Sequence, residues 1–268
     1  MARSKLFLSA MLFFGFVFLY LPILILVIYS FNENRLVTVW SGWSFKWYVS
    51  LFQNEALLGA AWLSLRLALI AGALSAVLGT LAGLALSRAG RFFGRPVFSG
   101  LLAGPLVLPD VLLGISLLML FVFLQGTLGW PSERGALTIV LAHTTFGLCY
   151  VTLVVQARLA GLNTVLEDAA MDLGARPLKV LFAITLPMLA PAIAAGFLLA
   201  FTLSLDDLVI ASFVTGPGAT TLPMMVFSAA RLGVKPEINA LATILVSIVT
   251  VIVVAVAVLS AREMRRSN

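Results

Sequence analysis

Long apolar runs without a charged side chain constrain this chain more than any other feature of its sequence. The first run extends from Leu6 to Phe31 and contains 26 residues. A helix needs roughly 20 apolar residues to cross the hydrocarbon core of a bilayer. The apolar part of a signal peptide is shorter, about 7–15 residues, and precedes a small-x-small cleavage site that does not follow here. We therefore expect residues 6–31 to form a retained membrane-spanning helix.

Five further apolar runs predict the remainder of a membrane bundle. One of them, residues 97–132, has 36 residues, which corresponds to about 54 Å of helix and is too long for one upright span. Pro105 and Pro109 suggest that it is kinked near residues 105–109. We predict an all-α integral membrane protein, a six-helix transmembrane bundle forming a single domain over residues 1–268. The predicted spans are residues 6–31, 67–87, 97–132, 136–157, 188–215 and 238–261.

Composition excludes several classes of protein. Hydrophobic residues make up 62% of the chain and charged residues 10%, whereas a soluble domain has about 45–50% apolar and 25% charged residues. Because the chain has one Cys and one His, it cannot build a zinc or iron–sulfur site of the usual kind. We expect neither a metal nor a cofactor bound by this chain.

The distribution of basic residues predicts the topology. Six spans place both termini on one side of the membrane. The loops on that side then carry eleven Lys and Arg residues, and the opposite loops carry five, with Arg66 at the end of a span. Since basic residues accumulate in cytoplasmic loops, both termini are expected in the cytoplasm. This bias accounts for the net charge of +6 without a nucleic-acid partner.

The segment of residues 158–187, between the fourth and fifth spans, is too long and too patterned for a simple connection. Its sequence is RLAGLNTVLEDAAMDLGARPLKVLFAITLP. Apolar residues recur at helical spacing up to Leu173, which predicts a first short helix. Asn163 or Thr164 can cap its start, and Gly174 suits a left-handed stop at its end.

A second short helix is expected to begin at Arg176-Pro177 and to end at Pro187. The pattern alone fits two structures about equally well. One is a helix–turn–helix that lies on the cytoplasmic face and receives a partner. The other is an amphipathic interfacial helix that only seals the bundle.

The spacing in this segment resembles the coupling loop of ABC importer permeases. That signature is an acidic residue, two alanines, three residues, Gly, nine residues and then Ile-x-Leu-Pro. The usual first residue is Glu, whereas here Asp168 occupies the position and Glu167 precedes it, so either carboxylate can take the acidic role. The matching residues are Asp168, Ala169, Ala170, Gly174, Ile184, Leu186 and Pro187.

The resemblance extends along nearly the whole chain. It is carried by the segments FNENRLVTVWSGWSFKWY, PLVLPDVLLGISLL, LSLDDLVIASFVTGPGATTLPM and KPEINALATI. These look like the permeases of polyamine importers, and most like the second permease subunit of putrescine importers. The resemblance implies a permease that forms half of a translocation path for a polyamine, expected to be putrescine, in a bacterial inner (plasma) membrane.

The resemblance also implies the partners. They are a second, related permease, two ATPase subunits that bind ATP and Mg, and a periplasmic substrate-binding protein. The need for a separate ATPase also follows from the residues themselves. No phosphate-binding G-x-x-x-x-G-K-[ST] motif occurs in the chain, so ATP-driven transport by that route needs a separate ATPase.

Four ionisable residues lie within the apolar runs: Asp110, His143, Asp206 and Asp207. A carboxylate at the centre of a bilayer costs at least about 2.5–3.5 kcal/mol, so such groups usually face the interior or a polar pathway. We expect at least one of Asp206 and Asp207 to line a path for an organic cation, and Asp110 either to line it or to cap a helix. His143 fits a hydrogen-bonding role between helices better than a proton relay.

Other function classes are less consistent with the sequence. A solitary ion-coupled transporter could use the same carboxylates, but it needs no docking loop. An intramembrane enzyme lacks support, because neither a Ser/His pair nor a His-Glu-x-x-His motif is evident. Within the importer class, spermidine or another small solute is the alternative cargo.

Overall fold

The computed structural model describes residues 2–35, 39–233 and 236–266 of the chain. Within these ranges the regular structure is helical, and extended backbone pairs only in an isolated bridge between Asn32 and Trp43. The all-α fold predicted from the apolar runs is confirmed. The chain forms two compact units, residues 1–58 with 226–268 and residues 59–225, each described by itself below.

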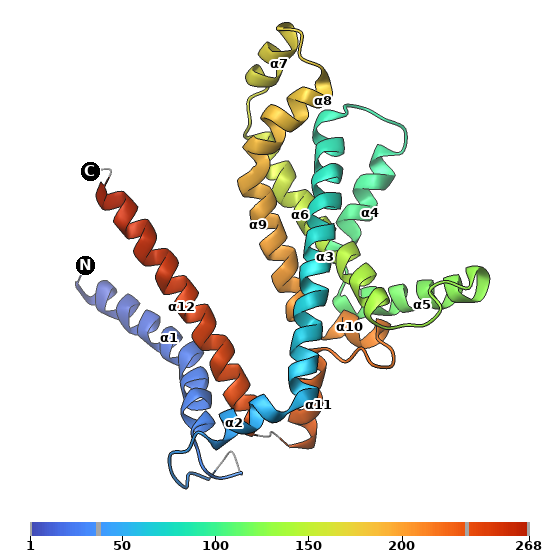
Figure 1. The fold of residues 1–268 in the computed structure, drawn as a ribbon. Coiled ribbons are helices and arrows are strands. Elements are labelled where there is room, and N and C mark those ends of the chain that lie inside the picture. The colour runs from blue at the N-terminus through green and yellow to red at the C-terminus, as the bar shows by residue number, and fades with distance from the viewer. Residues whose placement is uncertain (1, 36–38, 234–235, 267–268) are drawn as a thin grey trace. The chain divides into compact units, whose positions relative to one another are not determined.

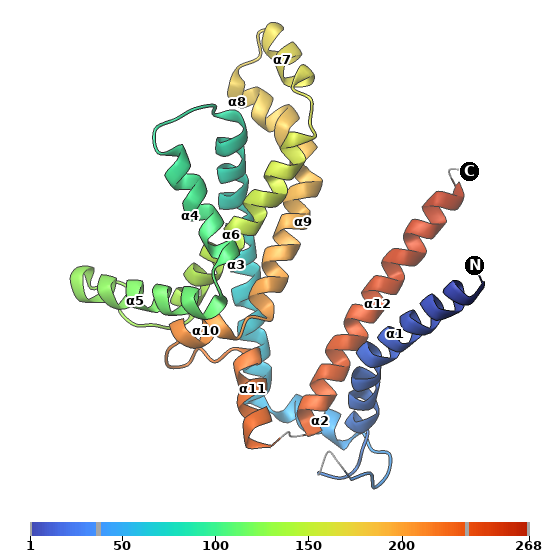
Figure 2. The same cartoon turned by 180° about the vertical axis from the view of Figure 1, so that it is seen from behind.

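The first unit combines the N-terminal and C-terminal helices of the chain. It contains α1 (Ala2–Ser30), α2 (Lys46–Gln53) and α12 (Pro236–Arg266). Helix α12 packs against both α1 and α2, and the Ser50 hydroxyl on α2 donates a hydrogen bond of 2.8 Å to Glu237 at the start of α12. Helix α1 begins and α12 ends at the same end of this unit, so the two run antiparallel (Figures 1 and 2).

The second unit is organised around α6 (Ala136–Ala160). Of the apolar stretch of α6, 67% is buried, the largest share among the candidate spans in the described part of the chain. Helix α6 packs against α4 (Arg95–Val107), α9 (Leu186–Leu205) and α10 (Val209–Val214). Small residues let α3 (Glu55–Arg88) approach α6 closely, because a Cβ atom on Gly79 would lie 2.6 Å from Cβ of Val151.

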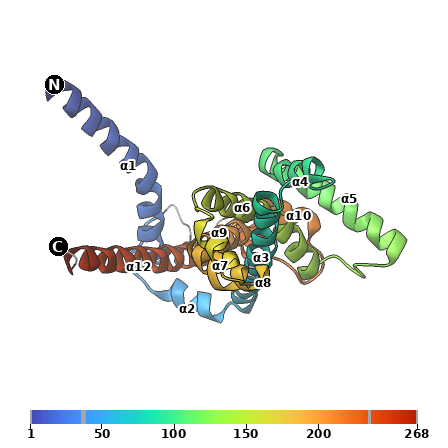
Figure 3. The same ribbon diagram turned by 90° about the horizontal axis from the view of Figure 1, so that it is seen from above.

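Helix α5 (Asp110–Leu128) projects sideways from the group formed by α3, α6 and α9 (Figures 1 and 3). Its first half packs on α10, and Leu113, Leu117 and Phe121 share a core cluster with Ile210 of α10. Only 22% of its apolar stretch is buried. Most of α5 therefore presents apolar side chains outward, as a lipid-facing helix or one with a further partner does.

Five helical segments of the described residues are long and apolar enough to cross a membrane, and α12 contributes a shorter apolar stretch, Pro236–Val251. The five are Phe7–Ser30, Glu55–Arg88, Asp110–Leu128, Ala136–Ala160 and Pro177–Leu205. Helix α3 begins twelve residues before the predicted span 67–87. Arg66 therefore lies within α3, exposed, and not at its outer end.

Two predicted spans are broken in the structure. The run 97–132 is not one kinked helix, because α4 ends at Val107 and α5 starts at Asp110. The intervening Leu108-Pro109 is extended, since Pro109 disfavours helical backbone at the residue before it. The run 188–215 also divides, between α9 and α10.

Residues 158–187 form α7 (Val165–Asp172), α8 (Pro177–Val180) and a π-helical turn, Leu181–Thr185, that leads directly into α9. The prediction that Pro187 ends the second helix is wrong. Pro187 occupies the first turn of α9, where its missing N–H is tolerated, and the π-turn before it accommodates the altered hydrogen bonding. Helix α11 (Leu222–Leu232) follows α10.

Candidate functional site

The break between α9 and α10 contains the acidic pair. Helix α9 ends at Leu205, and the amide of Asp206 closes its last turn on the carbonyl of Thr202 at 3.2 Å. Helix α10 starts at Val209, so neither aspartate lies inside a helix. The expectation that both aspartates lie within one spanning helix, residues 188–215, is therefore corrected. Irregular backbone at membrane depth is tolerated where it is buried in protein or lines a polar cavity.

Asp207 is held by hydrogen bonds. Its Oδ1 accepts from the amide of Ile210 at 3.3 Å, and its Oδ2 accepts from the amide of Ala211 at 2.7 Å. These contacts satisfy two of the amides that the first turn of a helix leaves without a partner. The same Oδ2 lies 3.1 Å from Nε2 of His143 on α6. Asp207 therefore connects α10 to the central helix of the unit.

His143 is buried, with 4% of its surface exposed, and both of its ring nitrogens have partners. Its Nδ1 lies 2.6 Å from the hydroxyl oxygen of Ser204 in the last turn of α9. The expectation that His143 hydrogen-bonds between helices agrees with these contacts. Ser204 was missed, because 61 residues separate it from His143 and a serine in an apolar helix carries no signal of its own.

The Ser204–His143–Asp207 arrangement corrects the expectation that no Ser/His pair exists. Its surroundings do not suit nucleophilic chemistry, however. The Ser204 residue is only 8% exposed, so a substrate cannot reach its hydroxyl, and Asp207 is occupied by backbone amides as well as by the ring. The three residues form a hydrogen-bonded clamp across α6, α9 and the start of α10.

Asp206 has a different environment from its neighbour. Its side chain is exposed. Within the described part of the chain, no other residue donates a hydrogen bond to its carboxylate or forms an ion pair with it. A carboxylate in an apolar setting is stabilised by a cation or by water. Asp206 is therefore the member of the pair that is free to meet a charged ligand.

Asp110 lies at the other break. It is the first residue of α5 and is exposed, with Pro109 at the capping position and no side-chain hydrogen bond to the helix amides. The alternative that Asp110 caps α5 through such a bond is not seen, although its charge suits the positive end of a helix. Leu113 and Ile210, each three residues after an aspartate, belong to one core cluster. The two breaks therefore start helices that pack together.

The tip formed by α7 and α8 separates the two acidic residues that the sequence left as alternatives. Glu167 is engaged within the chain: its Oε1 accepts from the Thr185 hydroxyl at 2.9 Å and lies 3.5 Å from Nη2 of Arg88. Asp168 is exposed, as is Ala169, while Ala170 is half-buried. Of the two carboxylates, Asp168 is the one open to a partner.

Gly174 ends α7 in a left-handed conformation, with φ of +86°. Its amide bonds the carbonyl of Met171 at 2.8 Å, and the amide of Ala175 bonds that of Ala170 at 3.0 Å. This pair of bonds is the Schellman motif, which favours Gly at the left-handed residue. The predicted stop at Gly174 has the expected geometry. Of the two predicted caps, Asn163 makes a side-chain hydrogen bond: its Oδ1 accepts from the amide of Val165 at 3.2 Å. Thr164 makes no side-chain cap.

The remaining residues of the signature lie at the base of the tip. Ile184 belongs to the π-turn and is half-buried, as is Leu186, while Pro187 is exposed. Apolar side chains of the tip also face outward, and Leu173 is 90% exposed. The others are Val165, Leu166, Met171, Leu178 and Phe182.

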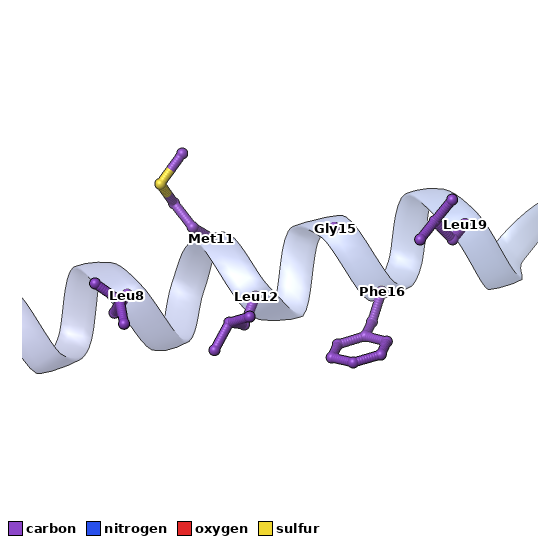
Figure 4. Close-up of a pocket in the computed structure, with 6 residues that line it drawn as sticks. All are labelled: Leu8, Met11, Leu12, Gly15, Phe16 and Leu19. Carbon is purple, nitrogen blue, oxygen red and sulfur yellow. The ribbon is translucent and has the colours of Figure 1, made fainter. Parts of the chain in front are cut away.

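One hollow in the structure lies on α1. It is lined by apolar residues of successive turns of that single helix, and its lining is almost wholly apolar (Figure 4). Such a surface suits lipid or an apolar helix rather than a polycation. Among the described residues, no group of three or more His, Cys, Asp and Glu side chains could hold a metal. The lining residues are Leu8, Met11, Leu12, Gly15, Phe16 and Leu19.

Comparison with known proteins identifies the family. The family model described as "Binding-protein-dependent transport system inner membrane component" matches residues 75–266. The chain is 59% identical over 238 residues to the putrescine transport system permease protein PotI of Escherichia coli (strain K12), covering 89% of this chain and 85% of that one. It is 42% identical over 253 residues to the spermidine/putrescine transport system permease protein PotC of the same strain, covering 94% and 93%.

Solved structures agree at the level of fold. A chain of a bacterial ABC transporter that imports the acidic polysaccharide alginate matches with a TM-score of 0.72 and 17% identity, covering 97% of this chain and 96% of that one. A chain of the MetNI methionine ABC transporter matches with a TM-score of 0.57 and 18% identity, over 79% and 95%. The chain belongs to the family of inner membrane components of binding-protein-dependent transport systems, as a permease subunit of an ABC importer and not an enzyme.

Proposed function

We propose that this chain is one of two permease subunits of an ATP-driven polyamine importer, with putrescine as its cargo. The 59% identity to PotI, named for putrescine, exceeds the 42% identity to PotC, named for spermidine and putrescine. Spermidine or another small solute is the alternative cargo. The proposal assigns half of the translocation path to this chain and the other half to a second, related permease.

The observation that carries the proposal is a continuous helical segment that joins the exposed tip to the acidic break. Helical structure runs without interruption from Pro177 to Leu205, 29 residues, or about 44 Å. Asp206 follows directly. A displacement of the tip therefore moves the carboxylate at the far end of one continuous helix. This arrangement suits a permease whose path is opened by a partner.

The tip is proposed as the docking site of the ATPase. The proposed contacts are the exposed Asp168, the small residues Ala169 and Ala170, and the turn at Gly174, with Ile184, Leu186 and Pro187 at the base. Small side chains allow close approach, and Asp168 can meet a basic group of the partner. Glu167 instead fixes the tip to Arg88 and Thr185. One ATPase subunit on each permease gives two, and these bind the ATP and Mg.

The carboxylates at the breaks are proposed to line the path. A polyamine is a polycation at neutral pH and loses hydration when it enters a narrow passage. At about 4 Å and an effective dielectric constant near 20, a carboxylate and an ammonium attract by about 4 kcal/mol before desolvation. Asp206, and Asp110 at the neighbouring break, can offset part of that cost. Binding must stay weak enough for release.

The remaining parts of the proposal concern the surroundings of the chain. The apolar, largely exposed α5 offers a face to lipid or to the second permease. The inner excess of basic residues supports cytoplasmic termini, with the tip on the same side. A periplasmic binding protein would deliver the polyamine on the opposite side.

The experiment that tests the proposal is co-purification followed by reconstitution. The tagged chain, expressed with its genomic neighbours, is expected to bring down an ATPase and a second permease. In proteoliposomes that contain the complex and its binding protein, labelled putrescine should enter only with ATP. Uptake by the purified chain alone, driven by a proton or sodium gradient, would instead establish a solitary secondary transporter. A preference for spermidine would change only the cargo.

A further inference from the structure

The buried contacts of His143 point to a role that the proposed function does not include. We propose that His143, together with Ser204, is a positioning residue of the transport path. It holds Asp207 inside the protein and thereby leaves Asp206 as the one carboxylate of the pair that meets the cationic cargo. This inference rests on the proposed import of a polycation.

The hydrogen-bonding capacity of the three side chains supports this assignment. An ionised Asp207 can only accept, and it already receives two backbone amides. Nε2 of His143 must therefore carry a proton in order to bond Oδ2 at 3.1 Å. In the neutral ring Nδ1 is then an acceptor, and the Ser204 hydroxyl donates to it over 2.6 Å. Each donor of this network therefore meets an acceptor, and the network specifies one arrangement of the break.

The position of the ring explains why His143 controls the break. His143 belongs to α6, which packs against both α9 and α10. One of its nitrogens bonds the last turn of α9, and the other bonds Asp207, which accepts hydrogen bonds from the first turn of α10. A single planar ring therefore sets the separation of the two helix ends, between which Asp206 lies. Loss of the ring would leave this separation to the backbone alone.

As a result, the two carboxylates lie in different environments. Asp207 has three N–H donors around it, and its side chain is 11% exposed. Asp206 has no such donors from other residues in the described part of the chain and is exposed. If Asp207 were released, both neighbouring carboxylates could bind the same cation. A cargo held by both would leave more slowly. The clamp therefore favours passage as well as binding.

A double-mutant cycle in the reconstituted complex tests this role. We expect His143→Ala to lower ATP-dependent putrescine uptake about tenfold, while ATPase activity stimulated by the loaded binding protein stays within twofold. In an Asp206→Asn background, His143→Ala should lower uptake by less than twofold further, because the carboxylate it positions is gone. His143→Gln should retain most uptake, since its amide offers one donor and one acceptor side by side.

Other results would overturn the inference. A full tenfold loss in both backgrounds would mean that His143 acts independently of Asp206. Equal losses of uptake and ATPase activity would mean a general structural role, and unchanged uptake would mean no role. If His143→Ala does not assemble, Ser204→Ala carries the same cycle, with about a threefold loss expected in the wild type and none in the Asp206→Asn background.

A thiol-labelling arm is independent of cargo. In a Cys149→Ala complex, a cationic methanethiosulfonate reagent should modify Asp206→Cys at least tenfold faster than Asp207→Cys, and His143→Ala should speed the reaction at position 207. Equal rates at the two positions would overturn the clamp. Absence of putrescine uptake by the wild type, with the labelling contrast intact, would overturn the proposed cargo and leave the positioning role of His143 standing.

Discussion

At the scale of single residues, the acidic pair shows how neighbours of the same type come to differ. Asp206 and Asp207 are indistinguishable in sequence, and both lie in an apolar run. Their environments differ because α9 ends at Leu205, so that the Asp207 side chain bonds His143 and Asp206 remains exposed. Burial and hydrogen bonding, rather than residue type, decide which carboxylate is available to a ligand.

This difference predicts opposite consequences for two matched substitutions. Asp207→Asn should destabilise the complex by about 1–3 kcal/mol, because an amide nitrogen would face N–H donors that now meet a carboxylate oxygen. Asp206→Asn should leave stability unchanged and lower putrescine uptake about tenfold, which corresponds to about 1.4 kcal/mol at the limiting step. Thermal unfolding of the purified complex and labelled uptake measure the two effects. Equal stability of the two variants would contradict the assignment.

At the scale of elements, apolar runs predicted where helices lie better than where they end. Gly174 was predictable as a stop, because left-handed backbone is a local property of glycine. The break after Leu205 was not, because no Pro or Gly marks it and the contacts that stabilise it come from α6, far away in sequence. Pro187 predicted a helix end that does not exist, since the π-turn before it lets the helix continue through Pro187.

The turn at Gly174 gives a prediction about coupling. Gly174→Val should cost about 1 kcal/mol or more in backbone strain at φ of +86°. Since a Cβ atom there would meet nothing within 4 Å, the chain itself has room for it. Uptake should therefore fall sharply through changed docking, while the subunit still inserts. Gly174→Asn is the matched control, because Asn tolerates left-handed backbone. Normal transport by the Val variant would remove this turn from the coupling path.

The contact between α3 and α6 gives a prediction about stability. Gly79→Ala would place a methyl group 2.6 Å from Cβ of Val151 and 2.8 Å from the carbonyl oxygen of Leu148. Overpacking of this kind costs about 1–3 kcal/mol, and thermal unfolding should record it. Gly59→Ala on the same helix is the control, since its added atom meets nothing within 4 Å. The same loss in both variants would show that helix flexibility, not close packing, is responsible.

At the scale of the whole molecule, the sequence was informative about membrane class, family and the pattern of the tip, because these depend on composition and local spacing. It was silent about the clamp, because a hydrogen bond between residues 143 and 204 has no local signature. The role of Asp110, Asp206 and Asp207 in a translocation path and the orientation of the chain in the membrane remain predictions. Orientation can be tested on α6 alone, since Glu133 shortly precedes its first residue, Ala136, and the tip follows its last, Ala160.

Helix α6 has 25 residues, about 37 Å, and therefore spans the roughly 30 Å hydrocarbon core. A cysteine at Glu133, just before α6, and one at Leu173, on the exposed tip, must then react from opposite sides. In a Cys149→Ala background we expect a membrane-impermeant thiol reagent to reach position 133 from the periplasm. Positions 173 and 267, the latter outside the described residues, should react only after the membrane is opened. The basic residues motivate this direction, since they are concentrated at the ends expected to be cytoplasmic. The reverse pattern would place the tip outside, where no ATPase can dock, and would overturn both the topology and the coupling role of residues 158–187.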